Sequence, residues 1–467
     1  MSIPWLPWTA DAFAQARVAA KPVLLFISAT WCRGCDDMER TTYADPSVQK
    51  LVADHFVAVR VDADRRPDIL ERYTLGGVPT TAFLTGDGII FGGGTYVPAD
   101  RMAGALEQAA AAFASRRDEI EQRAHRIAGA PAPHSGTAPS SNDLIAGVFE
   151  TYDTEHGGFG SGGKFPITSP LHLALALGAD ASSPFRGIVE HTLDAMRGGA
   201  LYDAVDGGFF RCAASRDWQN ASQEKLLEVN AALLRLYVEA ADVLESERYR
   251  ETAVDVLRYV QTCLSDPVDG GWAGSQRGDT VDRTIYSGWN AQMVSAALRA
   301  AESLNDPSLG EFAVKSLERV LLAAYRPGAG VAHCDDAEAQ VRGLLDDQIQ
   351  MAAASLDAFD ATGNVVYSMM AEELGHYVLR TMWDDADPGF LDRVDGDDEV
   401  GLLKQRAKPF VSNCDAASLM GRLAVASGTH EFREKAEAAL SSLAVAAPSH
   451  GPLAAHYLLA VRECALR

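Results

Sequence analysis

The chain has 467 residues, of which 47% are hydrophobic, so it is a folded protein too long for one ordinary hydrophobic core. Its formal net charge of -23 argues against a nucleic-acid backbone or an anionic membrane surface as the main partner. No run of about 18 apolar residues suggests a membrane span. The first residues also show no secretory signal, and we therefore expect a cytoplasmic protein.

Seven cysteines are spread unevenly along the chain, and only Cys32 and Cys35 stand close together. The scattered positions of the others match neither a secreted disulfide framework nor a zinc spacing. We therefore expect a reducing compartment, no metal ion and no cofactor.

The first 125 residues alternate between helical and strand-like patterns. Helices are predicted at 13–20, 32–42, 45–55, 68–73 and 99–117, and strands at 22–28, 56–62, 78–84 and 89–91. This order, with a Cys-x-x-Cys pair after the first strong strand, resembles the thioredoxin fold. The first domain, 1–125, is therefore expected to be an α/β thioredoxin-like domain.

The cysteine pair lies where the first strong strand gives way to a helix. At that step the free backbone N–H groups and the helix dipole stabilise a thiolate on Cys32, and Cys35 one turn later can attack a mixed disulfide. Trp31 and Arg33 flank the first cysteine; Arg33 favours the thiolate, and the two aspartates after Cys35 oppose it. The alternative is that the two cysteines are unreactive or form a purely structural disulfide.

The thioredoxin resemblance has two further implications. It implies that Pro79 is cis and faces the cysteine pair, and that the backbone of Val78 pairs with an extended substrate or a bound disulfide; the alternative is an ordinary strand-edge proline. Phe26 stands where thioredoxin has a buried aspartate. A proton acceptor for the resolving thiol is therefore missing, unless another group serves.

A linker rich in proline, glycine, alanine and serine is predicted at 126–141, before a second domain at 142–467. This domain carries six glycine turns, each followed by an apolar residue, with about two amphipathic helices between successive turns. Six such hairpins predict an all-α (α/α)6 toroid, because a closed ring buries the apolar stripe of each hairpin. An open helical solenoid is the alternative.

Polar and aromatic residues gather near these turns. Carboxylates and aromatic faces around a ring suit a polyhydroxylated ligand, and paired carboxylates can act as acid and base in glycoside cleavage. The alternative is that the aromatic residues pack and the acidic ones cap helices. The candidate cavity residues are Lys164, Tyr202, Asp203, Asp206, Arg211, Glu224, Lys225, Trp289, Asn290, Asp346 and Asp347.

The whole chain resembles the family typified by spermatogenesis-associated protein 20, whose toroid is similar to that of N-acylglucosamine 2-epimerases. This resemblance implies the two-domain architecture, with a six-hairpin glycosidase-like toroid. Epimerases of this kind use histidines as acid and base, and His333 is the only histidine predicted near a glycine turn on the inner side. The residues that carry the resemblance include 32–35, 61–64, 66–69, 157–160, 164–166, 199–203, 207–211, 224–225, 230–231, 287–290 and 412–413.

Three functions remain open from the sequence. The first is a thiol-disulfide oxidoreductase with a protein disulfide or dithiol partner, in which Cys32 is the nucleophile and Cys35 resolves. The second is a carbohydrate-active enzyme in the toroid, an epimerase, isomerase or hydrolase, beside a structural thioredoxin-like domain. The third is a non-catalytic protein-binding scaffold.

Overall fold

The computed structural model describes residues 2–128, 139–178, 182–336, 341–396 and 399–466. The chain forms two compact units, Met1–Pro133 with Asp395–Ala407, and His134–Val394 with Lys408–Arg467. The segment Asp395–Ala407 falls in the range expected for the toroid, and nothing in the sequence pattern predicts that it groups with the first unit. Of the predicted linker at 126–141, residues 129–138 lie outside the described residues.

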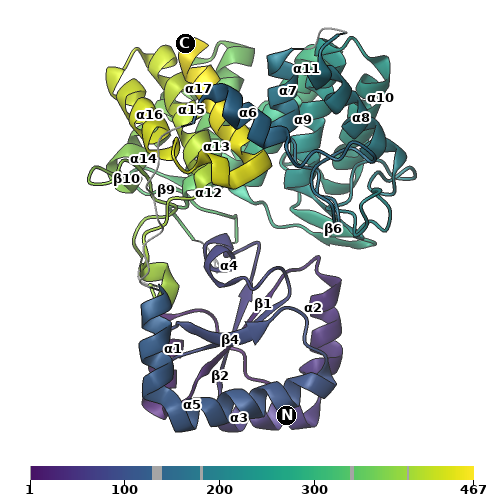
Figure 1. Ribbon diagram of the computed structural model, residues 1–467. Coiled ribbons are helices and arrows are strands. Elements are labelled where there is room, and N and C mark those ends of the chain that lie inside the picture. Colours follow the sequence, from purple (N-terminus) through teal and green to yellow (C-terminus); the bar gives the residue numbers. More distant parts are fainter. Residues whose placement is uncertain (1, 129–138, 179–181, 337–340, 397–398, 467) are drawn as a thin grey trace. The chain divides into compact units, whose positions relative to one another are not determined.

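The first unit has a four-stranded sheet in the order β2-β1-β3-β4 (Figure 1). The strands are β1 (Val23–Ser28), β2 (Val57–Asp62), β3 (Thr80–Leu84) and β4 (Ile90–Gly94). β1 runs parallel to β2 and antiparallel to β3, and β3 is antiparallel to β4. All six residues of the central β1 are buried, which explains its nearly unbroken apolar sequence.

Helices complete the thioredoxin-like fold. They are α1 (Ala10–Ala19), α2 (Arg33–Asp37), the π-helical turn η1 (Met38–Thr42), α3 (Pro46–His55), α4 (Pro67–Tyr73) and α5 (Ala99–Ala128). The Trp8 ring contacts Phe13 on α1 and Tyr73 on α4, so these two helices share one cluster. The helix predicted at 32–42 is thus α2 continued by η1, and the closing helix runs on to Ala128.

The returning segment is held to the first unit by hydrogen bonds to its helix α4. The Tyr73 hydroxyl donates to the Gly88 carbonyl at 2.6 Å and accepts from the Leu402 N–H at 2.8 Å. Arg72 Nε donates to the Leu402 carbonyl at 3.0 Å. Gly401 has φ +60°, and a Cβ there would lie 2.3 Å from the Gly88 carbonyl oxygen, so only glycine permits this approach.

The second unit consists of helical hairpins (Figure 1), which form a closed ring. The inner helices α7, α9, α11, α13, α15 and α17 each pack against the next, and α17 packs against both α6 and α7, which closes the ring. The toroid prediction is confirmed over the described residues, and the open solenoid is excluded. The helices are α6 (Ser141–Phe149), α7 (Ser169–Leu177), α8 (Pro184–Gly198), α9 (Leu227–Val243), α10 (Glu247–Tyr259), α11 (Ser287–Leu304), α12 (Pro307–Ala324), α13 (Leu345–Thr362), α14 (Val365–Met382), α15 (Phe410–Ser427), α16 (His430–Leu443) and α17 (Ala454–Leu466).

Short strands and turns interrupt the helices of this unit. A three-stranded antiparallel sheet joins β5, β6 and β7, and two-residue ladders pair β8 with β9 and β10 with β11. The bounds are β5 (Glu224–Leu226), β6 (Ser275–Arg277), β7 (Thr280–Asp282), β8 (Tyr325–Arg326), β9 (Gly330–Val331), β10 (Trp383–Asp384), β11 (Gly389–Phe390), η2 (Val260–Leu264), η3 (Gly401–Lys404) and η4 (Ala447–Leu453). The helix predicted to begin at Glu224 therefore begins at Leu227.

A buried amide clamps four of the glycine turns to the inner helix that follows. Asn290 Oδ1 accepts from the Trp272 N–H at 2.8 Å, while its Nδ2 donates to the Trp272 carbonyl at 2.9 Å. The same two bonds join Asn230 to Phe209, Gln348 to Val331 and Asn413 to Phe390. Each clamp satisfies both backbone groups of a buried turn residue and so fixes the start of an inner helix.

None of the helices in the described residues is long and apolar enough to cross a bilayer.

Candidate functional site

The cysteine pair lies at the strand-to-helix step that its sequence context predicts. Cys32 is the N-cap residue of α2, and its Sγ accepts a hydrogen bond from the Cys35 N–H at 3.1 Å. The two sulfurs are joined in a disulfide. On reduction, the same N–H and the helix N-terminus would stabilise a thiolate on Cys32.

Trp31 fixes the backbone just before Cys32. Its indole Nε1 donates to Asp64 Oδ2 at 2.7 Å, and both side chains are buried. Arg33 points outward with 70% of its side chain exposed, and its Nε lies 4.0 Å from Asp37 Oδ2. Such an exposed pair contributes little to stability.

The Val78–Pro79 peptide bond is cis, as the thioredoxin resemblance implies. Pro79 packs on Gly34, one of the two residues between the cysteines: a Cβ built on Gly34 would lie 3.2 Å from Pro79 Cδ and 3.6 Å from Tyr96 Cδ2. Val78 is half-buried beside it. Of the residues expected to support the redox site, Pro79 is thus placed beside the Cys-x-x-Cys segment.

Phe26 packs in an aromatic cluster, tilted against Trp5 and Tyr43, at the position where thioredoxin has its buried aspartate. Its ring lies 4.8 Å from that of Tyr43, whose hydroxyl is 3.0 Å from Thr81 Oγ1. Burial raises the pKa of Tyr43 well above its ordinary value, which keeps the phenol protonated at neutral pH. Tyr43 therefore does not replace the missing carboxylate as a base.

Several predicted cavity residues take part in the architecture of the glycine turns. Lys164, which is fully buried, pairs with Asp153 at 2.8 Å, and Lys225 pairs with Asp203 at 2.6 Å. The other carboxylate oxygen of Asp153 and of Asp203 accepts hydrogen bonds from backbone N–H groups of the same turn. Asp206 is one of these N–H donors and is exposed.

Tyr202 and Asn290 also have structural partners. The Tyr202 hydroxyl donates to Asp255 Oδ2 at 2.6 Å, and the Arg197 guanidinium lies 3.6 Å from the centre of the Tyr202 ring. Asn290 is the clamp on Trp272 described above. These two side chains contribute to helix packing and turn closure.

Other predicted residues gather at the N-terminal ends of the inner helices. Arg211 Nε donates to Glu224 Oε1 at 2.7 Å. Asp347 bonds to His333 Nδ1 at 2.9 Å and accepts from the Gly288 N–H at 3.0 Å. The ring of Trp289 on α11 lies 4.6 Å from that of Tyr286.

Two carboxyl groups in this region hold protons unusually tightly. Burial, together with the charge of Asp346, raises the pKa of Glu228 to about 7, against the effect of Arg211. Burial also raises the pKa of Asp346 to about 6, with contributions from Asp415 and Asp347. Asp346 is nevertheless an exposed residue at the start of α13. Glu228 was not among the residues predicted from the sequence.

A central channel of about 650 Å³ runs between the inner helices. Two carboxylate–histidine pairs line it: His172 Nδ1 with Glu239 Oε2 at 2.5 Å, and His456 Nδ1 with Asp415 Oδ1 at 3.0 Å. A neutral imidazole in such a pair carries its proton on Nδ1, so Nε2 is left as an acceptor. Both histidines were missed, although His172 is conspicuous in the apolar segment 169–177.

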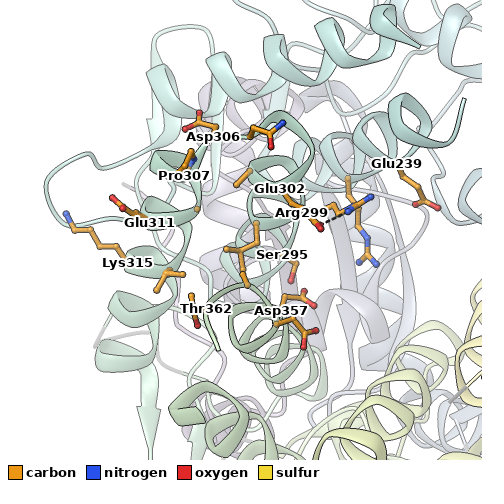
Figure 2. Close-up of a pocket in the computed structure, with 18 of the residues that line it drawn as sticks. Glu239, Ser295, Arg299, Glu302, Asp306, Pro307, Glu311, Lys315, Asp357 and Thr362 are labelled. Carbon is orange, nitrogen blue, oxygen red and sulfur yellow. Dashed lines mark hydrogen bonds and ion pairs between the residues drawn. The ribbon is translucent and has the colours of Figure 1, made fainter. Parts of the chain in front are cut away.

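The channel shares lining residues with a larger recess of about 1340 Å³ at the C-terminal ends of α9, α11 and α13 (Figure 2). Arg299 and Glu302 of α11 are paired there at 2.6 Å, and Glu239, Ser295 and Asp357 line both spaces. Among the described residues, no group of three or more histidine, cysteine, aspartate or glutamate side chains is placed to hold a metal ion.

Comparison with known proteins supports both units. Residues 1–130 match the family model Thioredox_DsbH, described as a protein of unknown function, DUF255. Human spermatogenesis-associated protein 20 is 26% identical over 354 residues, which cover 69% of this chain and 45% of that protein. The thiol:disulfide interchange protein DsbD of Escherichia coli is 39% identical over 85 residues, 17% of this chain and 15% of that protein. The chain thus spans about half the length of the first of these relatives.

Solved structures share the toroid fold. A D-mannose isomerase aligns with a TM-score of 0.56 at 14% identity, covering 66% of this chain and 88% of that one. A sugar epimerase from a ruminal bacterium aligns with a TM-score of 0.55 at 13% identity, covering 64% and 83%. At these identities the likeness establishes the fold alone.

Proposed function

We propose that this chain, a homologue of the spermatogenesis-associated protein 20 proteins, is a thiol-disulfide oxidoreductase that reacts through Cys32. The observation that carries the proposal is the Cys32–Cys35 disulfide at the N-cap of α2, beside the cis Val78–Pro79 bond. The similarity of 85 residues to DsbD, a thiol:disulfide interchange protein, supports it.

The exchange reaction follows from this placement. A partner thiolate attacks Cys32 Sγ, the Cys32–Cys35 bond breaks, and its electron pair leaves with the Cys35 sulfur, which takes up a proton. A second thiolate of the partner then attacks the mixed disulfide and displaces Cys32 as a thiolate. Two electrons pass from the partner dithiol to the cysteine pair, and the reverse sequence reduces a partner disulfide.

A disulfide-reduction assay tests the proposal. Dithiothreitol-driven reduction of insulin should be catalysed by the wild-type chain and abolished in Cys32→Ser. Cys263→Ser serves as a matched control, because this free cysteine lies outside the pair. Equal activity of wild type and Cys32→Ser would remove the oxidoreductase assignment.

A second candidate function is favoured by the raised pKa values of Glu228 and Asp346. A carboxyl that stays protonated near neutral pH can donate a proton to a hydroxyl or glycosidic oxygen. Together with Arg211 and Trp289, this pair suits a polyhydroxylated ligand in the toroid, and the sugar epimerase and D-mannose isomerase that share this fold act on sugars. The experiment below measures both binding and turnover of such a ligand.

A panel of mono- and disaccharides offered to the Cys32→Ser/Cys35→Ser chain separates the two candidates. Binding or turnover that survives this double substitution and is lost in Glu228→Gln would place the carbohydrate activity in the toroid. A panel without any binding would reject the second candidate and leave the first unaffected.

A further inference from the structure

Among the described residues, three arginines line the central channel of the toroid, and they differ in how they are engaged. Arg422 pairs with Asp357 at 2.6 Å and lies 3.7 Å from Asp360. Arg235 of α9 and Arg462 of α17 are exposed and form no hydrogen bond or ion pair with the residues that the structure describes. Two guanidinium groups are therefore free to bind a ligand in the channel.

The carboxylates along the channel are mostly engaged already. Of the five among its described lining residues, two are hydrogen-bonded to histidine and two lie within 3.7 Å of Arg422. The protein as a whole carries a net charge of -23 and repels anions in general. An anion that enters the channel would therefore be held by the free guanidinium groups and not by an overall attraction.

Arg235 lies on the same face of α9 as Glu228, one of the two carboxyl groups of the second candidate function. The two residues are about two turns apart, so they stand one above the other, about 10 Å apart along the helix. Ala231 and Ala232 lie between them and line the channel, which identifies this face as the inward one.

The other carboxyl group lies at the same end of the channel as Glu228. Asp346 stands at the start of α13, and Gln350 and Ala353, about one and two turns further along the helix, line the channel. Glu228 and Asp346 thus mark one end of the channel, and Arg235 lies further inside it.

Polar side chains line the wall between these groups. One of them, Ser169, is 5% exposed, and its Oγ has no hydrogen-bond partner among the described residues, so the wall holds a polar group that the chain itself leaves unsatisfied. Such a wall suits a ligand with several hydroxyl groups. The hydroxyl and amide side chains of the wall are Thr168, Ser169, Gln292, Ser295, Gln350 and Ser418.

We propose that the channel binds an anionic sugar, a polyhydroxylated molecule that carries a phosphate or carboxylate group, and that Arg235 holds this group. A guanidinium can bind either anion through two parallel hydrogen bonds. A single sugar ring with such a substituent can span the distance from Arg235 to Glu228 and Asp346. The inference rests on the second candidate function, for which it names the class of ligand.

Isothermal titration calorimetry at fixed ionic strength tests the proposal with glucose and mannose, their 6-phosphates, and glucuronate, which carries a carboxylate at the same carbon. In wild type, an anionic sugar should bind at least about tenfold more tightly than its neutral parent, a difference of about 1.4 kcal/mol. The 6-phosphates and glucuronate show which anion is preferred.

Arg235→Gln should remove this advantage, and Arg235→Lys, which keeps the charge, should retain part of it. Arg101→Gln, at an exposed arginine of α5, serves as the matched control and should bind like wild type. Since the Arg235 side chain makes no hydrogen bond within the described chain, Arg235→Gln should unfold at the wild-type temperature, so that a loss of binding reports the site and not the fold.

Equal binding of neutral and anionic sugars, an advantage that survives in Arg235→Gln, or no binding of any anionic sugar would each overturn the proposal. The second candidate function is judged separately with Glu228→Gln. Binding of neutral sugars that is lost in Glu228→Gln and unchanged in Arg235→Gln would keep that function and reject this inference. Binding of an anionic sugar that needs Arg235 but shows no turnover would keep the inference and reject Glu228 as a proton donor.

Discussion

The indole Nε1 of Trp31 donates to Asp64 Oδ2 across 2.7 Å, in a buried pair that adjoins the reactive Cys32. Asp64→Ala should leave the indole N–H buried without this acceptor, at a cost of about 1–3 kcal/mol in the free energy of unfolding. Asp64→Asn keeps an acceptor oxygen and should lose less. Urea unfolding measures all three chains, with the exposed Asp54→Ala as a control expected to change little. If Asp64→Ala unfolds at the same urea concentration as wild type, the Trp31–Asp64 hydrogen bond contributes nothing to the stability of the fold.

The buried carboxylate of Asp153 should make the toroid sensitive to acid. Arg216, Lys164 and turn N–H groups hold the pKa of Asp153 well below 3.8, against the effect of burial. A depressed pKa stabilises the fold above the unfolded-state pKa, and this contribution is lost as the pH falls through the folded-state value.

Asp153→Asn should therefore be less stable than wild type by about 3 kcal/mol at pH 7, because it leaves buried Lys164 without its counter-charge. The difference should shrink below about pH 4. Thermal unfolding at pH 7, 5 and 3 checks this, and a constant difference across that range would contradict the assignment.

Glu228 should have the opposite pH dependence. Its folded-state pKa of about 7 lies above the ordinary value of 4.5, so the native state binds the proton more tightly than the unfolded state does. Stability is therefore lost as the pH rises from 4.5 through 7. Glu228→Gln should match wild type at pH 4 and exceed it by about 2 kcal/mol at pH 8. Urea unfolding at pH 4 and pH 8 measures the effect, with the exposed Glu247→Gln as the control. If Glu228→Gln differs from wild type in its free energy of unfolding by the same amount at both pH values, the pKa of Glu228 is not raised.

The amide clamps should each be costly to remove. Asn290→Ala takes away the bonds to both backbone groups of Trp272 and leaves them buried. We expect a loss of about 2–4 kcal/mol in the free energy of unfolding, compared with little change for the exposed Asn142→Ala. A loss below about 1 kcal/mol would mean that water or a local shift satisfies the turn.

Local patterns predicted much of this structure. The apolar run at 22–28 and the Cys-x-x-Cys pair are short-range signals, and they correctly indicated the strand and the cysteine at the start of a helix. The cis Val78–Pro79 bond was expected from the thioredoxin resemblance and is confirmed. The glycine turns predicted the toroid because each unit repeats the same pattern at a similar spacing. Element boundaries were less certain, and the short sheet formed by β5, β6 and β7 was not predicted, since three-residue strands carry no periodicity.

The missed features depend on contacts between residues far apart in the sequence. His172 meets Glu239 from 67 positions away, and His456 meets Asp415 from 41 positions away. Tyr73 meets Leu402 from 329 positions away, which explains why the segment Asp395–Ala407 could not be assigned to the first unit. For the same reason Lys164 and Lys225 looked like cavity residues, although their carboxylate partners lie in the glycine turns.

The central claim is that Cys32 is the sulfur that forms the mixed disulfide with a partner. Its most direct test is peptide mapping by mass spectrometry of Cys35→Ser and Cys32→Ser after each is mixed with a protein disulfide such as insulin. We predict a stable mixed disulfide on Cys32 in the first variant and no conjugate on Cys35 in the second, since Cys35 is 1% exposed. A conjugate on Cys35 in the Cys32→Ser chain with none on Cys32 in the Cys35→Ser chain would contradict the account. The absence of a conjugate in both chains would also contradict it.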